Sequence, residues 1–148
     1  MSRTVITQRY KCRIQAMIPA LREIGIEPAA FEVIPNGKII EFISGEGSVA
    51  TKVFARLKHV FIGTRSDIGF VPVEGGCYEV VMSSQDSFTA VGQKFMLREN
   101  GGTGEFNRIC AKHDALEKAK KMIPQGHRVE TCETQKDGRI RIEITVED

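Results

Sequence analysis

A repeated arrangement of glycines constrains the fold of this chain more than any other feature of its sequence. Two helix-like segments end at a glycine, and in each case ten residues separate this glycine from Asn-Gly or Asp-Gly, which a cation and Ile follow. The positions are Gly25, Asn36 and Gly37 in the first half, and Gly126, Asp137 and Gly138 in the second. Corresponding glycines lie 101 residues apart in both cases. Glycine after a helix provides a left-handed cap, and Asx-Gly accepts the positive φ angles of a two-residue hairpin turn. The pattern predicts that residues 14–43 and 115–146 form equivalent helix–hairpin units.

Hydrophobic periodicity supports both helices. Apolar residues recur at helical spacing from Ile14 to Ile24, and again from Phe106 to Ile123. Pro19 falls within the first of these segments, where it is tolerated if the helix begins near Gln15.

Strands are indicated by turn residues at their ends or by alternating apolar and polar residues. Residues 29–44 are expected to form two strands joined at Asn36-Gly37, and residues 66–84 a hairpin that turns at Glu74 to Gly76. The buried face of this central hairpin is predicted to consist of Val71, Val73, Tyr78, Val80 and Met82. The last strand, from Ile140 to Val146, alternates apolar and polar residues.

These elements predict one α+β domain over residues 1–148. Two helices pack on a largely antiparallel sheet, with an internal helix–hairpin duplication, because a helix and a hairpin cannot cover their own apolar faces. A hydrophobic content of 41% and a charged content of 27% are ordinary for a globular chain.

Composition also indicates the cellular compartment in which the protein is expected. The first residues contain no apolar core of a signal peptide, and no apolar run has the length of a membrane span. Cys12, Cys77, Cys110 and Cys132 form no close pairs. We therefore expect reduced thiols, no bound metal and a cytoplasmic location.

Several segments carry a family resemblance. The helix end "ALREIG", the central "DIGFVPVEGGCYEVV" and the terminal "QGHRVETCETQKDGRIRIEI" resemble the hypothetical chloroplast reading frame thirty-five family, also filed as domain of unknown function twelve fifty-seven. The likeness covers about two thirds of the chain. Relatives are often encoded beside ATPases of the AAA+ class, so the resemblance implies a partner role beside such an ATPase. The chain departs from these relatives after the Tyr-Glu strand, where it has "MSSQDS" in place of aromatic residues, and near Arg108 to Ala111.

Candidate catalytic groups are sparse. Cys110 and His113 lie three residues apart on one predicted helix, where their side chains can be neighbours. A zinc site would require two further ligands, and a nucleophilic thiol would require a lowered pKa. The glycine-rich "ISGEGSV" and "ENGGTGEF" lack the order of residues of a phosphate-binding loop. The sequence thus predicts no cofactor and no catalytic residue, and a thiol- or metal-dependent enzyme is the most distant alternative.

A protein-binding role is the principal prediction, and an AAA+ ATPase is the partner that the resemblance implies. We expect the binding surface in the segment from Asp67 to Phe95, where exposed strand backbone would offer unpaired donors and acceptors. The predicted contact residues are Asp67, Glu74, Glu79, Ser84 and Phe88.

Nucleic-acid binding is the alternative prediction. It would use cations of the second helix and the last strand, namely Arg108, Lys118, Lys121, Arg139 and Arg141. On a helical wheel the helix cations point all around the axis, which favours a solvated surface over a phosphate-binding face. The net charge of +2 is also small for a polyanion partner.

Overall fold

The computed structural model describes residues 5–10, 13–44, 47–74, 78–122, 127–135 and 140–146. The strands are β1 (Val5–Tyr10), β2 (Phe31–Ser44), β3 (Gly47–Leu57), β4 (Ile68–Pro72), β5 (Tyr78–Ser83), β6 (His127–Thr134) and β7 (Ile140–Val146). The α-helices are α1 (Ile14–Glu23), α2 (His59–Ile62), α3 (Ala90–Phe95) and α4 (Glu105–Met122). Short 3-10 helices are η1 (Pro28–Ala30), η3 (Asp86–Phe88) and η4 (Arg98–Asn100).

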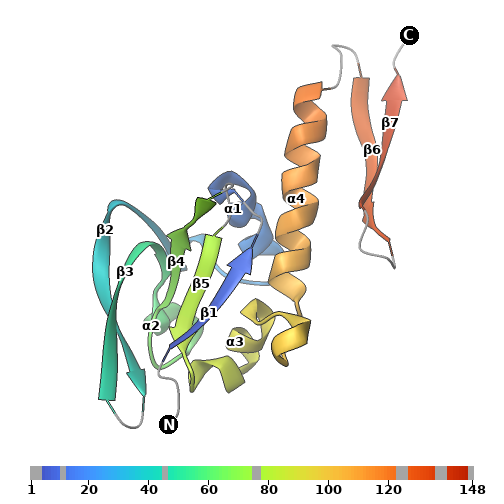
Figure 1. The fold of residues 1–148 in the computed structure, drawn as a ribbon. Coiled ribbons are helices and arrows are strands. Elements are labelled where there is room, and N and C mark those ends of the chain that lie inside the picture. The colour runs from blue at the N-terminus through green and yellow to red at the C-terminus, as the bar shows by residue number, and fades with distance from the viewer. Residues whose placement is uncertain are drawn as a thin grey trace.

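Five strands form an antiparallel sheet in the order β1-β5-β4-β3-β2. The central strands β4 and β5 therefore have a partner on each side, and β1 and β2 are the outer strands. The remaining strands, β6 and β7, form a separate antiparallel pair beside α4 (Figure 1). The α+β prediction is confirmed.

The end of α1 follows the predicted glycine cap. Gly25 has φ +88, its amide donates to the carbonyl of Arg22, and the amide of Ile26 donates to the carbonyl of Leu21. These two bonds are those of a Schellman motif, in which the residue after the glycine packs back on the last turn. Ile26 and Leu21 are accordingly both buried. The cap turns the chain from α1 towards β2.

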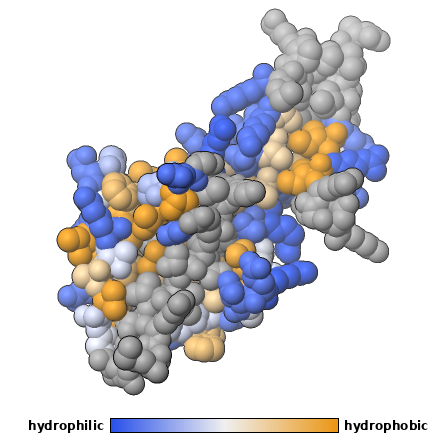
Figure 2. Space-filling view, viewed as in Figure 1, coloured by the Kyte–Doolittle hydropathy of each residue, from blue (hydrophilic) through white to orange (hydrophobic). Residues whose placement is uncertain are grey.

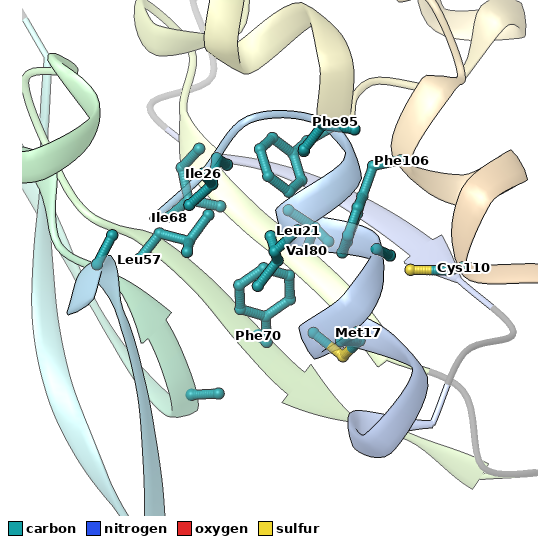
Figure 3. Close-up of a cluster of buried hydrophobic side chains, with 14 of the residues drawn as sticks. Met17, Leu21, Ile26, Leu57, Ile68, Phe70, Val80, Phe95, Phe106 and Cys110 are labelled. Carbon is teal, nitrogen blue, oxygen red and sulfur yellow. The ribbon is translucent and has the colours of Figure 1, made fainter. Parts of the chain in front are cut away.

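The main core lies between one face of the sheet and helices α1, α3 and α4. Phe70 of β4 stands at its centre, and its ring centroid lies 6.1 to 6.2 Å from those of Phe31, Phe95 and Phe106 in edge-to-face geometry. Figure 3 shows Phe95 and Phe106 side by side above Phe70, with Cys110 of α4 beyond them. Such aromatic pairs add about 0.5–1.5 kcal/mol each beyond the area that they bury.

A second, smaller core covers the opposite face of the sheet. It contains Ile40 and Phe42 of β2, Val53 of β3 and Val81 of β5. The β2–β3 hairpin thus folds over the sheet. This close approach depends on Gly69 of β4, because a Cβ there would lie 2.4 Å from Cγ1 of Val53.

The predicted hairpin turn at Asn36-Gly37 is wrong. Residues 31–44 form one strand, and the register with β3 shifts between Val33 and Lys38, where four residues of β2 face a single residue of β3. Gly37 does adopt the positive φ that the dipeptide favours, +77, but it does so within this bulge. The hairpin ends instead at the pair Ser44 and Gly47.

The internal duplication is therefore not shown. Its first half is a helix followed by one long strand, whereas its second half is a helix followed by the β6–β7 hairpin. Gly126, Asp137 and Gly138 lie outside the described residues.

Two further sequence predictions need correction. Val71 and Val73 were expected on the buried face of the central hairpin, but the residues of β4 that face the main core are Ile68 and Phe70. Val71 faces the second core, which the sequence did not predict. Residues 5–10, for which no strand is predicted from the sequence, form β1 and pair with β5 from Val5 and Ser83 to Tyr10 and Tyr78.

The substitution Gly69→Ala tests the approach of the β2–β3 hairpin to the sheet. The added methyl group must displace Val53 or Phe42, so we expect a loss of about 1–3 kcal/mol in the free energy of unfolding, measured by urea denaturation. Ser48→Ala, at an exposed position of β3, is the control and should change stability by less than about 0.5 kcal/mol. Equal urea midpoints for Gly69→Ala and the unaltered protein would contradict the close packing.

Candidate functional site

The residues predicted for partner binding do not share one exposed surface. Asp67 is buried at the start of β4, and Glu79 is half-buried on β5. Glu74 and Phe88 are exposed, and Phe88 is 83% accessible. Ser84 is half-buried, and its carbonyl accepts a hydrogen bond from the hydroxyl of Ser87. The expectation of exposed strand backbone at the central hairpin is wrong, because β4 and β5 are interior strands.

Apolar side chains are exposed instead on the outer face of the β2–β3 hairpin. Ile39 is 67% accessible and Ile43 is 44% accessible, and both lie on the side of β2 opposite to Ile40 and Phe42. Their cross-strand neighbours on β3 are Lys52 and Ser48. We define the hairpin surface as the six exposed residues of this face: Ile39, Glu41, Ile43, Ser48, Ala50 and Lys52. Figure 2 shows apolar residues gathered over the β2–β3 side of the molecule.

Buried polar residues fix one end of the hairpin surface. The amide of Ile43 donates to Oγ of Ser66 at 2.6 Å, and the carbonyl of Ile43 accepts from Oγ of Ser83 at 2.7 Å. Asp86 in turn accepts the amides of Arg65 and Ser66 at 2.8 and 2.9 Å. Since Ser66, Ser83 and Asp86 are buried, these hydrogen bonds replace water that the groups would otherwise need. The backbone beneath Ile43 is thus held by the loop before β4 and by the end of β5.

A second polar cluster joins three neighbouring segments of the sheet. Arg56 of β3 binds Glu32 of β2 through Nε and Nη2, at 3.0 and 2.9 Å, and binds Asp67 through Nη1 at 3.1 Å. Asp67 also accepts the amide of His59 at 2.8 Å, and Nδ1 of His59 lies 2.6 Å from the same carboxylate oxygen. The guanidinium supplies several donors in a fixed plane, which suits it to such a bridge.

The pKa of Asp67 records the balance of these contacts. Burial alone would raise it, but the backbone and ring hydrogen bonds of His59 and the charge of Arg56 outweigh burial and hold the pKa below its ordinary value. Both carboxylate oxygens of Asp67 are occupied by these partners. The cluster therefore stabilises the turn from β3 through α2 to β4.

A shallow apolar pocket lies between α1 and the segment from Ile26 to Phe31. Its volume is about 200 Å³, and its lining is Ile18, Leu21, Arg22, Ile26, Glu27, Pro28 and Phe31. Sites for drug-sized ligands or cofactors usually measure about 300–1,000 Å³ and contain several convergent polar groups. This pocket is better suited to one apolar side chain than to a cofactor.

The thiol and imidazole groups do not assemble into a reactive site within the described chain. Cys110 is buried in the main core, whereas Nε2 of His113 lies 3.1 Å from Oε1 of Glu23. Burial raises the pKa of Cys132, and Lys112 offsets this only in part, so this thiol is less nucleophilic than usual. No group of three or more potential metal ligands occurs among the residues whose positions are described. Cys12 and Cys77 lie outside them.

The cations of the nucleic-acid alternative are distributed over two elements, and two of them pair with acids. Arg108, Lys118 and Lys121 are exposed on α4, where Nζ of Lys118 lies 3.1 Å from Asp114. Arg141 on β7 binds Glu143 at 2.8 Å. Arg139 lies outside the described residues. Paired cations present less positive charge to phosphate groups, which weakens this alternative.

Within the described part of the chain, no helix has the length and apolar character needed to cross a bilayer. Comparison of the chain with family models, curated proteins and solved structures yields no match.

The substitution Asp67→Asn tests the role of the second polar cluster. The amide keeps the shape of the side chain, but it removes the charge facing Arg56 and half of the acceptor capacity. We expect a loss of about 2 kcal/mol in the free energy of unfolding at pH 7, measured by urea denaturation. The exposed Glu74→Gln is the control and should have little effect.

The pH dependence of the free energy of unfolding is a second test of the role of Asp67. Because the pKa of Asp67 is lower in the folded state, its contribution is complete above the unfolded value of about 3.9 and is lost as the pH falls through the folded value. The rise of stability with pH below about pH 5 should therefore be less steep in Asp67→Asn. An unchanged slope would show that Asp67 is not held as the charged form.

Proposed function

We propose that the protein is a non-enzymatic binding module of the cytoplasm, and that another protein binds to the hairpin surface. The observation that carries this proposal is the exposure of Ile39 and Ile43 on a rigidly held strand pair. Large apolar residues grouped on one exposed face are typical of interaction sites, whereas single ones are not informative.

The energetics of the hairpin surface favour a partner with apolar side chains. Complete burial of a fully exposed isoleucine contributes about 1.5–3 kcal/mol. Because Ile39 is 67% and Ile43 44% accessible, the two together can contribute about as much as one such residue. Glu41 lies between them along the strand, and Lys52 lies opposite Ile39. These charges would set the orientation of the partner more than its affinity.

The polar clusters support a binding role over a catalytic one. The most buried carboxylates, Asp67 and Asp86, each accept hydrogen bonds from backbone amides and so serve to hold loops in place. A general acid or base would instead direct its carboxyl group to a cleft that a substrate can enter. An ATPase of the AAA+ class, which the family resemblance implies, is the first partner that we would test.

A comparison of matched variants tests the proposal. The tagged protein and its Ile39→Asp variant are purified from the native host, and a protein that co-purifies in stoichiometric amount is quantified. We expect at least a tenfold loss of that protein with Ile39→Asp, which corresponds to about 1.4 kcal/mol. Val60→Asp on α2 is the matched control, because Val60 is 73% accessible but lies outside the hairpin surface.

Two other variants test the alternative binding surfaces, namely the segment around Phe88 and the cations that could bind nucleic acid. Loss of the partner with Phe88→Asp but not with Ile39→Asp would move the binding site to the originally predicted segment. Retention on heparin that falls steeply with salt, and that falls further with Arg141→Glu, would favour the nucleic-acid alternative. Either result, obtained with variants of unchanged thermal stability, would contradict the hairpin surface.

A further inference from the structure

The β6–β7 hairpin forms a sheet of its own, and this leaves the outer edge of β7 without a strand partner in the part of the chain that the structure describes. In Figure 1 the hairpin runs alongside α4, away from the five-stranded sheet, and β7 is the strand farther from α4. A two-stranded sheet is only marginally stable alone, and an edge strand presents backbone donors and acceptors to any strand that can align with it.

The two faces of β7 differ in chemistry. Ile142 lies opposite Cys132 of β6, and both side chains are half-buried beside α4, so this face is turned towards α4 (Figure 1). Arg141 and Glu143 lie on the other face, with side chains 64% and 49% accessible, and they bind one another at 2.8 Å. An opposite-charge pair at positions i and i+2 therefore flanks an apolar residue.

This order of charges is self-complementary. In an antiparallel pair of identical strands centred on Ile142, residue 141 of one copy lies directly opposite residue 143 of the other. Both Arg141 side chains would then face Glu143 of the second copy, and the two Ile142 residues would meet on the side of α4. Opposite charges directly across an antiparallel pair are favourable, and like charges are unfavourable.

From this geometry we propose that a second copy of the chain pairs its β7 with β7, centred on Ile142, and joins two hairpins into a four-stranded sheet. The two-fold arrangement satisfies the backbone edge and gives each member of the intrachain Arg141–Glu143 pair an oppositely charged neighbour from the second copy. It also shields the half-buried Ile140 and Ile142 from water. This self-association is independent of the hairpin surface, which lies on β2 and β3.

The charges along the outer strand β2 are not self-complementary in this way. Centring two copies of β2 on Glu41 would place like charges opposite one another, and centring them on Ile40 or Phe42 would place Glu41 opposite an isoleucine. At the end of the strand, moreover, both backbone groups of Ile43 are already bound by Ser66 and Ser83. Charge complementarity therefore selects β7 over β2 as the strand that pairs with a second copy.

The test is a charge exchange followed by sedimentation velocity over a range of concentrations. The unaltered chain should shift from its monomer mass of 16.5 kDa towards twice that mass as the concentration rises. Arg141→Glu and Glu143→Arg should each weaken self-association at least tenfold, because each places like charges opposite one another. An equimolar mixture of the two variants should form a heterodimer, and the double variant Arg141→Glu/Glu143→Arg should dimerise as the unaltered chain does.

Lys121→Glu is the control for Arg141→Glu, because it makes the same change in net charge at an exposed position of α4 and should leave the dimer intact. Circular dichroism of every variant should match that of the unaltered chain, since both substituted residues are largely exposed. A chain that remains monomeric at millimolar concentration would overturn the proposal. So would a dimer that tolerates Arg141→Glu, or a mixture of the single variants that remains monomeric.

Discussion

The burial of both faces of β4 is the constraint on which the rest of the structure depends. Phe70 extends to one side and contacts aromatic rings from β2, α3 and α4. On the other side Gly69 has no side chain, and Val53 of the β2–β3 hairpin fills the space. A strand enclosed in this way can tolerate little change in volume on either side, because protein cores are as closely packed as organic crystals. The helices and the hairpin are thus positioned by two adjacent residues of opposite size.

Polar contacts around α2 and the loop that follows it hold the surface segments in place on this core. Asp67 and Arg56 fasten the turn before β4, and Asp86 and Ser66 fasten the loop that holds Ile43. Asp67 and Ser66 each bind groups from two segments, so the removal of either leaves others unsatisfied. The exposed isoleucines of β2 consequently sit on a backbone whose position is determined, which reduces the conformational entropy lost when a partner binds.

The sequence was informative where a local rule decides the structure. The periodicity of α4 predicted its bounds within one residue at each end, and Gly25 predicted the end of α1. The hairpin turn predicted at Asn36-Gly37 is wrong because the dipeptide favours a positive φ but does not determine whether the chain reverses there. In the structure Gly37 adopts this φ within a bulge, and the strand continues. Strand order is a long-range property: nothing near Glu79 signals that β1 will pair with β5 and make the central hairpin interior. The polar clusters were missed for the same reason, since Arg56, Glu32 and Asp67 come together only once the sheet has formed.

The pairing of β1 with β5 also has a kinetic consequence for the nascent chain. β1 is synthesised well before its partner, the strand that ends at Ser83. At roughly 5–20 residues per second, β1 waits several seconds before β5 is synthesised, and the sheet can be completed only afterwards. Contacts of such high sequence separation slow folding, because the loop between the strands must be closed before any pairing is gained. During translation β1 therefore presents unpaired backbone donors and acceptors until β5 has been synthesised.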